Sequence, residues 1–314
     1  MKKSTKYILA GLGFSIVSIY TYNKFIERTA TQNNLLSDKN GKYYGWKYGN
    51  IFYTKHGSGS PVLLIHDTDS SASSAEWSKL YSRLAKNHTV YAIDLLGCGR
   101  SDKPALEYTN YLYVQMILSF MKDVIQEKTT VISSNISSSF VIMANHMDSE
   151  LFDKIILINP AALSQLDMIP DKLSKIKKNI IQLPFIGTFI YNIMNNSKYI
   201  DEAFRTKYVT KPQLISSSME DIYYESAHKS GSTGRYLYSS LIGNYVNNSI
   251  THAVKSISTP TLIIGSSEMK RYALALDDYH KVNNDIDIIR ITNGSLYPHM
   301  EIPEKITSLI EDYI

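Results

Sequence analysis

Hydrophobic and polar positions alternate along most of this chain in short blocks separated by turn residues. Between apolar runs lie segments with helical spacing, such as residues 76–86, where Trp77, Leu80 and Leu84 share one face. Strands that alternate with helices are typical of βαβ units, so the pattern predicts an α/β fold with a mostly parallel twisted sheet flanked by helices. The predicted parallel strands are 62–66, 89–94, 130–134, 154–158, 260–265 and 286–291.

Other segments complete this prediction. Helical spacing continues at 111–125 and 137–146, and a closing helix is expected at 303–314. Near the start, the apolar segments 43–48 and 51–55 flank Gly49-Asn50, which predicts a β-hairpin with its turn at that dipeptide.

The alternation breaks between about residues 163 and 254. This region has helical spacing and is interrupted by Pro170, Pro184 and Pro212. An insertion that covers the sheet would have this pattern. We therefore predict a domain over residues 43–314 with a helical cap at about 163–254.

The first 28 residues have the pattern of a membrane anchor. Three lysines precede the uncharged run Tyr7–Tyr22, and Lys24 and Arg28 follow it. Sixteen residues of helix span about 24 Å, short of the ~30 Å hydrocarbon core, and the terminal tyrosines and lysines could cover the difference. We predict an uncleaved N-terminal membrane helix over residues 1–28, followed by a polar tether over residues 29–42.

Two alternatives for this segment stay open, a cleaved signal peptide and a buried soluble helix. The weak cleavage signal at Thr29-Ala30-Thr31 disfavours the first. The lysines near residue 1 favour a cytoplasmic N-terminus with the globular part on the extracytoplasmic side, although two cations on the other flank weaken that bias.

Composition and charge exclude several classes of function and site. Hydrophobic residues make up 44% of the 314 residues and charged residues 20%, which is ordinary for a globular protein. The net charge is +4, and no long basic stripe or zinc-finger spacing points to nucleic acid. The single cysteine, Cys98, excludes an internal disulfide and a multi-cysteine metal site. No metal or cofactor is expected.

Several short motifs fall at the expected turns. The ordered set resembles the α/β-hydrolase family over about residues 43–314, which implies that fold and an esterase-like chemistry. The most specific motif matches that family's D-x-x-G-x-G-x-S-x-x-P loop. The segments, in order, are VLLIHD (62–67) followed by Glu76-Trp77, DLLGCGRSDKP (94–104), LINPAA (157–162), TPTLIIG (259–265) and PHMEIPEKI (298–306).

The resemblance places Asn135 where the family keeps its nucleophilic serine. In G-x-S-x-G the serine forms a sharp strand-to-helix turn, and here the run is Ser133–Ser137 with Asn135 at its centre. Pro160 follows Asn135 by 25 residues, the spacing of about 25 that the family implies. Asn tolerates the positive φ of such a turn, but its amide is a poor nucleophile. A register with Ser137 as nucleophile is the alternative.

The other triad positions also differ. The family's G-H-x-P-H-x-E segment aligns with residues 295–301, so Leu296 holds the position of the catalytic base, and leucine accepts no proton. His299 matches the second, structural histidine, and could act as a base only after a loop rearrangement. Glu268 matches the acid position.

The oxyanion hole is implied by the same resemblance. Backbone amides of Thr68 and Ile136 would form it, and Asp67, in place of the usual glycine, would oppose a developing negative charge there. His66 is expected to be structural. Nothing near Cys98 in the sequence lowers its pKa, so no reactive thiol is expected.

Three functions follow from these residues. The first is a membrane-attached pseudo-hydrolase that retains a capped pocket for a small apolar or ester-like ligand. The second is an active ester or acyl hydrolase with Ser137 as relocated nucleophile, a histidine such as His299 as base, and Glu268 or Asp67 nearby. The third is an anchored interaction protein without a pocket ligand.

Overall fold

The computed structural model describes residues 3–268, 270–292 and 294–314, with backbone alone for residues 3–15, 214 and 271. Eight strands form one sheet in the order β1-β2-β4-β3-β5-β6-β7-β8. Strands β3 to β8 are parallel, and the β1–β2 hairpin adds antiparallel to β4. The strands are β1 Lys42–Trp46, β2 Gly49–His56, β3 Pro61–Ile65, β4 Thr89–Ile93, β5 Thr129–Ser134, β6 Phe152–Ile158, β7 Thr261–Ser266 and β8 Asp287–Ile291.

Helices cover both faces of this sheet. Because successive side chains of a strand point to opposite faces, Leu63 and Ile65 of β3 face one apolar core, while Val62 and Leu64 face another. The first core is closed by α3 (Asn110–Phe120), α4 (Ser137–Met147), α11 (Thr251–Ser256) and α12 (Lys270–Val282), and the second by α2 (Ser78–Leu84) and α14 (Pro303–Glu311). The predicted α/β fold with a mostly parallel sheet flanked by helices is confirmed.

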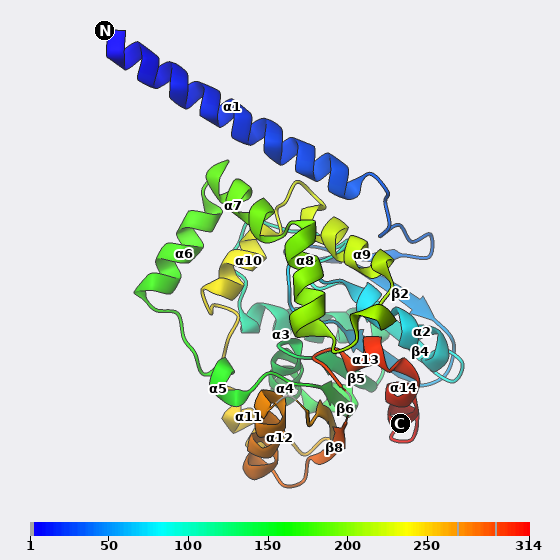
Figure 1. Ribbon diagram of the computed structural model, residues 1–314. Helices are drawn as coiled ribbons and strands as arrows, with labels where there is room; N and C mark the ends of the chain where they lie inside the picture. Colours follow the sequence, from blue (N-terminus) through cyan, green and yellow to red (C-terminus); the bar gives the residue numbers. More distant parts are fainter. Residues whose placement is uncertain (1–2, 269, 293) are drawn as a thin grey trace.

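The remaining helices lie mostly between β6 and β7 in the sequence. They pack against one another and cover the carboxyl ends of the strands (Figure 1). They are α5 Leu163–Leu166, α6 Lys172–Gln182, α7 Ile186–Met194, α8 Ser197–Ala203, α9 Ser217–His228 and α10 Arg235–Ile242, with a π-helical turn Phe204–Tyr208 and a 3-10 turn Pro212–Leu214. Elsewhere, 3-10 turns at Ser74–Trp77 and Ser149–Leu151, a π-helical turn at Met121–Ile125 and the short α13 (Pro298–Glu301) complete the secondary structure of the described residues.

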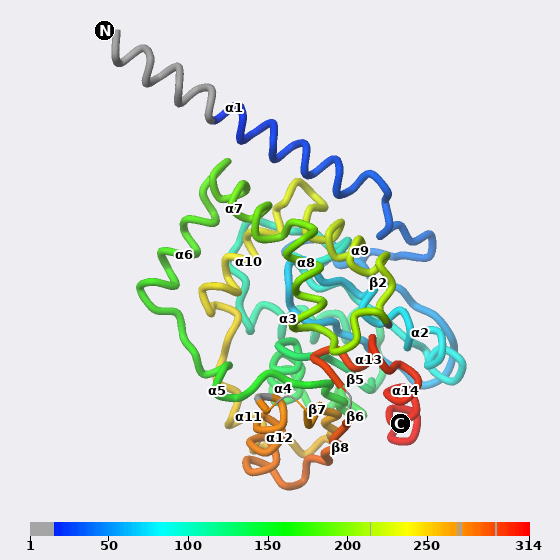
Figure 2. The backbone as a smooth tube through the Cα atoms, viewed as in Figure 1, coloured from blue at the N-terminus to red at the C-terminus, as the bar shows by residue number. Residues whose placement is uncertain are grey.

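The N-terminal segment forms helix α1 (Lys3–Thr31), whose later turns pack on α7 and α9 (Figure 2). Within the described residues, no helix combines the length and the hydropathy that a membrane crossing requires. The predicted tether needs correction, because residues 29–31 belong to α1 and the side chain of Leu36 is buried. The buried carboxylate of Glu225 on α9 accepts hydrogen bonds from the backbone N–H groups of Leu35 (2.6 Å) and Leu36 (3.3 Å).

One local prediction was wrong, and one helix was missed. The hairpin turn is Lys47-Tyr48, not Gly49-Asn50, since Trp46 pairs with Gly49. Asn50 belongs to β2, where its N–H donates to the carboxylate of Asp102 (2.7 Å). Helix α12 was not predicted, because polar residues interrupt its apolar positions.

Candidate active site

The turn between β5 and α4 has Asn135 at its tip. Asn135 has a φ of 43°, the left-handed region that asparagine adopts more readily than most residues. Its N–H donates to the carbonyl of Ile158, and its own carbonyl accepts from the N–H of Ala161 (3.2 Å). Strand β6 therefore holds the turn in place, and the half-buried Asn135 side chain points to the pocket above the sheet.

The carboxylate of Asp67 occupies the space between this turn and the end of β3. Its Oδ1 accepts from the backbone N–H groups of Thr68 (2.7 Å) and Ile136 (3.1 Å), the two amides expected to form an oxyanion hole. Its Oδ2 accepts from the side-chain amide of Asn135 (2.8 Å) and the hydroxyl of Tyr297 (2.7 Å). An anionic side chain of the protein itself thus satisfies the two donors that the family resemblance assigns to an oxyanion hole.

The environment of Asp67 also shifts its titration. Burial raises the pKa of this carboxyl from its usual 3.8 to about 6, and the nearby Glu76 carboxylate acts in the same direction. The hydrogen bonds from Asn135, Tyr297 and Thr68 oppose the shift, because they favour the ionised form. At neutral pH the hole holds a carboxylate.

A second buried cluster lies directly behind Asp67. Glu76 accepts from His299 Nε2 (2.9 Å) and the Ser134 hydroxyl (2.5 Å) with Oε1, and from the Asp67 backbone N–H (3.1 Å) with Oε2. The imidazole of His299 stacks on Trp77 at 4.3 Å between ring centroids. Burial raises the pKa of Glu76, but the hydrogen bond and charge of His299 outweigh it and lower the pKa overall. His299 is therefore engaged with Glu76 inside the core.

The residue at the position of the catalytic base is part of an apolar cluster. Leu296 is 1% exposed and packs among Tyr208, Tyr223 and Met300. Asn159, at the end of β6, fixes this loop by donating to the carbonyls of Ser295 (2.5 Å) and Leu296 (3.1 Å). Glu268, at the position of the acid, lies exposed in the bend after β7.

The alternative nucleophile, Ser137, is the first residue of α4 and is fully buried. Its hydroxyl donates to the carbonyl oxygen of His66 (2.6 Å) and is 2.7 Å from the Thr68 hydroxyl. Neither partner is a base that could remove its proton. Within the described chain, the structure does not bring Ser137 and an imidazole into hydrogen-bond contact.

His66 and Cys98 have structural surroundings. His66 lies between the carbonyl of Asp67 (2.6 Å from Nδ1) and the N–H of Leu95, which donates to Nε2 (3.0 Å). Burial lowers the pKa of this imidazole. The Cys98 thiol donates to the carbonyl of Asp69, and burial raises its pKa well above the usual value. A thiol in this state is inert as a nucleophile.

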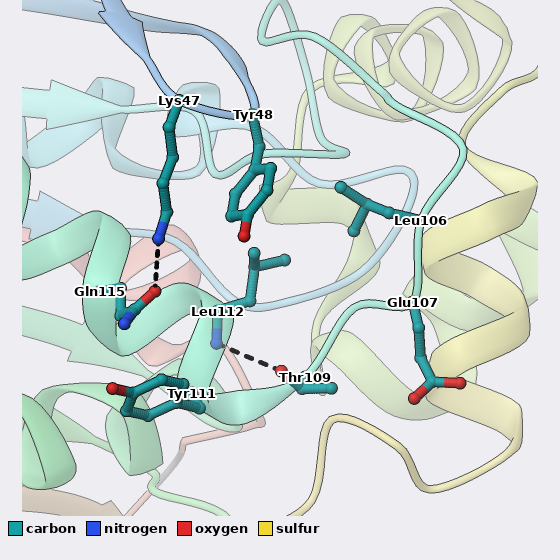
Figure 3. A pocket seen from close by; sticks show the side chains of 8 residues that line it. All are labelled: Lys47, Tyr48, Leu106, Glu107, Thr109, Tyr111, Leu112 and Gln115. Atoms are coloured by element: carbon teal, nitrogen blue, oxygen red, sulfur yellow. Dashed lines mark hydrogen bonds between the residues drawn. The ribbon is translucent and has the colours of Figure 1, made fainter.

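A pocket of about 260 Å³ opens in front of the occupied hole. Asp67, Asn135 and Tyr297 form its floor, and Leu241 and Ile242 line it from the cap together with Tyr208, Tyr238 and Lys207. A larger open hollow of about 500 Å³ lies between the β1–β2 turn and α3 (Figure 3). There Lys47 donates to Gln115 (2.8 Å), and no lining residue belongs to the turn at Asn135. Of the two, the smaller pocket lies where the strand ends converge, the usual place for ligand sites in parallel sheets.

No cluster of three metal-ligating side chains occurs in the part of the chain that the structure describes. Sequence reasoning missed the roles of Glu76, Tyr297 and Asn159. Both Glu76 and Tyr297 stand in motifs that the sequence singled out, but their contacts join segments more than 200 residues apart. Only the three-dimensional structure could reveal that Asp67 fills the hole and does not merely lie near it.

Comparison with known proteins agrees with this architecture. A family profile described as "Alpha/beta hydrolase family" matches residues 56–306. A 2-hydroxy-6-oxo-6-(2'-aminophenyl)hexa-2,4-dienoic acid hydrolase from Metapseudomonas resinovorans is 29% identical over 178 residues. The match covers 52% of this chain and 61% of that protein, so the chain spans less than two thirds of this relative.

Solved structures resemble the chain over most of its length. A serine hydrolase involved in carbazole degradation superposes with a TM-score of 0.69 at 17% identity, covering 87% of this chain and 97% of that one. A putative alpha/beta hydrolase from Nostoc sp PCC 7120 superposes with a TM-score of 0.71 at 17% identity and the same coverage. At this identity the likeness establishes the fold alone.

Proposed function

The chain belongs to the alpha/beta hydrolase family, and from that premise we propose that it is a member without serine-hydrolase turnover that retains a ligand pocket. One observation carries the proposal. The Asp67 carboxylate accepts from both backbone amides of the hole while the neighbouring turn presents the Asn135 side chain. The proposal concerns this chain, since its relatives are named as hydrolases.

In this geometry, the nucleophile, the general base and the free oxyanion donors that acyl transfer requires are all missing from their expected positions. The amide of Asn135 supplies no hydroxyl to attack a carbonyl carbon, and Leu296 cannot take a proton from an attacking group. The carbonyl oxygen of a substrate would also meet the negative Asp67 carboxylate in place of free N–H donors. Removing one such donor typically costs about 10²–10³ in kcat, and an anion in the hole is a larger obstacle.

The test is a gain of function. We expect the native chain to resist a fluorophosphonate probe and to leave p-nitrophenyl acetate unhydrolysed above background. The triple variant Asp67→Gly/Asn135→Ser/Leu296→His should react with the probe at residue 135, because it restores hydroxyl, base and open hole together. Asn135→Ser alone should remain silent, since the base is missing and the hole filled.

Ser137→Ala is the matched control. Probe labelling of the native chain that maps to Ser137 and disappears in Ser137→Ala would overturn the proposal and establish the relocated active site. Ser137 donates to the His66 carbonyl, which argues against that outcome. Circular dichroism of each variant separates loss of labelling from loss of fold.

The pocket of about 260 Å³ suits a small ligand with an apolar body against Leu241 and Ile242. Its presence favours a ligand-binding function over an interaction protein with a closed cap. A short-chain ester such as ethyl butyrate, if bound without turnover, should raise the melting temperature progressively as its concentration rises above the dissociation constant. Leu241→Arg should abolish that rise, whereas Leu106→Arg, at the open hollow, should preserve it.

Membrane attachment through the N-terminal helix is a further part of the proposal. Its support is the uncharged run Tyr7–Tyr22 with lysines on both sides. Flotation of the full chain with phospholipid vesicles tests it, and a chain that stays at the bottom of the gradient contradicts it. The proposed extracytoplasmic position of the domain predicts that trypsin added to intact cells degrades it, and survival of the domain would place it inside.

A further inference from the structure

The cap carries an exposed apolar stripe on helix α6. Leu173, Ile176 and Ile180 recur at helical spacing and are 55%, 54% and 42% exposed. Ile169 precedes them at 79% exposure, and Leu183 and Phe185 follow. We call Ile169, Leu173, Ile176, Ile180, Leu183 and Phe185 the α6 face. We propose that the α6 face lies on an anionic lipid bilayer surface.

The opposite side of α6 explains why this stripe faces outward. Ser174 and Ile181 are buried, and Gln182 donates to Ser239 on α10 (2.9 Å), so α6 is fixed on the cap by its other side. The apolar stripe is therefore not an unsatisfied part of the core. An exposed stripe of this size needs a partner, because large apolar side chains rarely cluster at the surface of a soluble monomer.

The charges around the α6 face select an anionic surface as that partner. Lys172 and Lys177 are exposed and flank the apolar stripe on either side by helical geometry. Asp171 caps the start of the helix with its carboxylate on the Ser174 N–H (2.7 Å). An amphipathic helix with lysines beside its apolar stripe fits the boundary between acyl chains and anionic headgroups.

The turn after α6 joins this face to the N-terminal helix. Phe185 has a φ of 58°, which a non-glycine residue adopts only under constraint, and the residue is 44% exposed. Its carbonyl accepts from the Asn23 side chain (3.2 Å), and its ring meets Tyr20 edge to face. Tyr22 makes a similar contact with Phe189 on α7.

These contacts place the α6 face beside the proposed attachment. If α1 meets a bilayer with its apolar run, Tyr20 and Tyr22 mark the end of that run, and the α6–α7 corner touches both of them. Tyrosines prefer the headgroup level of a membrane. This step rests on the attachment proposed above, whereas the stripe and its lysines stand independently of it.

The experiment uses a fluorophore on the full chain. Cys98 is fully buried, so a thiol-reactive, environment-sensitive dye will label an introduced cysteine selectively. Ile176→Cys reports on the α6 face, and Lys281→Cys, exposed at the end of α12, is the matched control. Vesicles of phosphatidylcholine and phosphatidylglycerol with brominated acyl chains should quench the dye at position 176 several-fold and leave position 281 unchanged. Lys172→Gln with Lys177→Gln should weaken the contact about fivefold per lysine.

Three outcomes would overturn the inference: no quenching at position 176, equal quenching at both positions, or a concentration-dependent spectral shift at position 176 without vesicles, which would indicate self-association. A separate variant tests whether α1 is the membrane attachment. Ile16→Asp with Val17→Asp removes an exposed apolar part of α1, and quenching at position 176 that survives this change supports the α6 contact on its own. Flotation without quenching at position 176 leaves the attachment standing and ends the inference.

Discussion

Asp67 combines deep burial with four hydrogen-bond donors, and it couples the strand end, the turn at Asn135 and the loop at Tyr297. A buried carboxylate costs free energy unless its lone pairs are satisfied. Here all four donors compensate only in part, since the pKa is still raised to about 6. Despite these four hydrogen bonds, protonation of Asp67 therefore stabilises the folded state.

This raised pKa predicts a pH dependence of stability. The folded state binds the proton more tightly than the unfolded state, so the contribution is fully present below the usual pKa and is lost as pH rises through about 6. The total change is about 3 kcal/mol in the free energy of unfolding. Asp67→Asn should remove this dependence, which urea unfolding at about pH 4.5 and about pH 8 would measure.

Asp153→Asn is the matched control, because Asp153 is exposed on β6. It should unfold with the same pH dependence as the native chain. An identical pH dependence in Asp67→Asn and in the native chain would show that Asp67 does not titrate as stated.

At the scale of elements, the loop after β4 fastens the sheet to the segment before α2. The buried Asp94 carboxylate accepts from Arg100 Nε (2.7 Å), from Arg100 Nη2 (2.9 Å) and from the Ser74 N–H (2.7 Å). Burial raises the pKa of Asp94, but the charge and hydrogen bonds of Arg100 outweigh it and hold the pKa at about 2. Gly99 is required beside this pair, since a Cβ there would lie 2.3 Å from Asp94.

Removal of the cation should be costly. Arg100→Met leaves Asp94 buried without its partner, so we expect the free energy of unfolding at pH 7 to fall by about 3–5 kcal/mol. Because the folded pKa is depressed, the native pair stabilises above about pH 4 and loses this contribution as pH falls toward 2. Arg83→Met, which breaks an exposed pair with Glu304, should have little effect in the same urea titration.

Periodicity predicted most elements because buried parallel strands are continuous apolar runs, and every residue of β3 and β5 is buried. It missed α12, where polar and charged residues separate the buried ones, which are Tyr272, Ala275, Leu276 and Tyr279. The hairpin turn was misplaced because Asp102, 52 residues away, binds Asn50. Local sequence patterns mispredict an element wherever a side chain far away in the sequence supplies the hydrogen bond that determines it.

At the scale of the whole molecule, both α1 and the segment that follows it are bound to the cap by hydrogen bonds. The Glu225 carboxylate accepts hydrogen bonds from the N–H groups of Leu35 and Leu36. On α1, the Asn23 side chain donates to the carbonyl of Phe185 and accepts from the side chain of Asn192 (2.9 Å). Sequence reasoning expected a free tether because residues 29–42 are polar. The backbone N–H groups of Leu35 and Leu36 instead find their partner on α9, about 190 positions later in the chain.

Loss of this fastening should be visible by proteolysis. Glu225→Ala removes both acceptors, so trypsin should cleave after the exposed Lys39 faster than in the native chain, while the domain itself resists. Glu220→Ala, on the same helix but without contact to the segment's backbone, is the control. Equal cleavage rates in all three chains would contradict the proposed role of Glu225.

Part of the candidate site could be predicted from local sequence, and part depends on contacts between distant segments. The motifs predicted the strand ends and the turn from short local sequences, and the amides of Thr68 and Ile136 do lie together, around the Asp67 carboxylate. They could not assign Glu76 to His299 or Tyr297 to Asp67, because those pairs form only when β3 and the C-terminal loop meet. Side-chain occupancy of the hole is a property of the assembled fold.

The filled hole also restricts how turnover could ever arise in this chain by mutation. A serine at position 135 has no base, a histidine at position 296 has no hydroxyl to deprotonate, and a glycine at position 67 merely empties a space. If the chain lacks turnover as proposed, each change alone leaves it without turnover, and the change at position 67 also removes four hydrogen bonds. On the proposed function, serine-hydrolase turnover would require all three changes together, so single substitutions at positions 67, 135 and 296 are expected to stay silent.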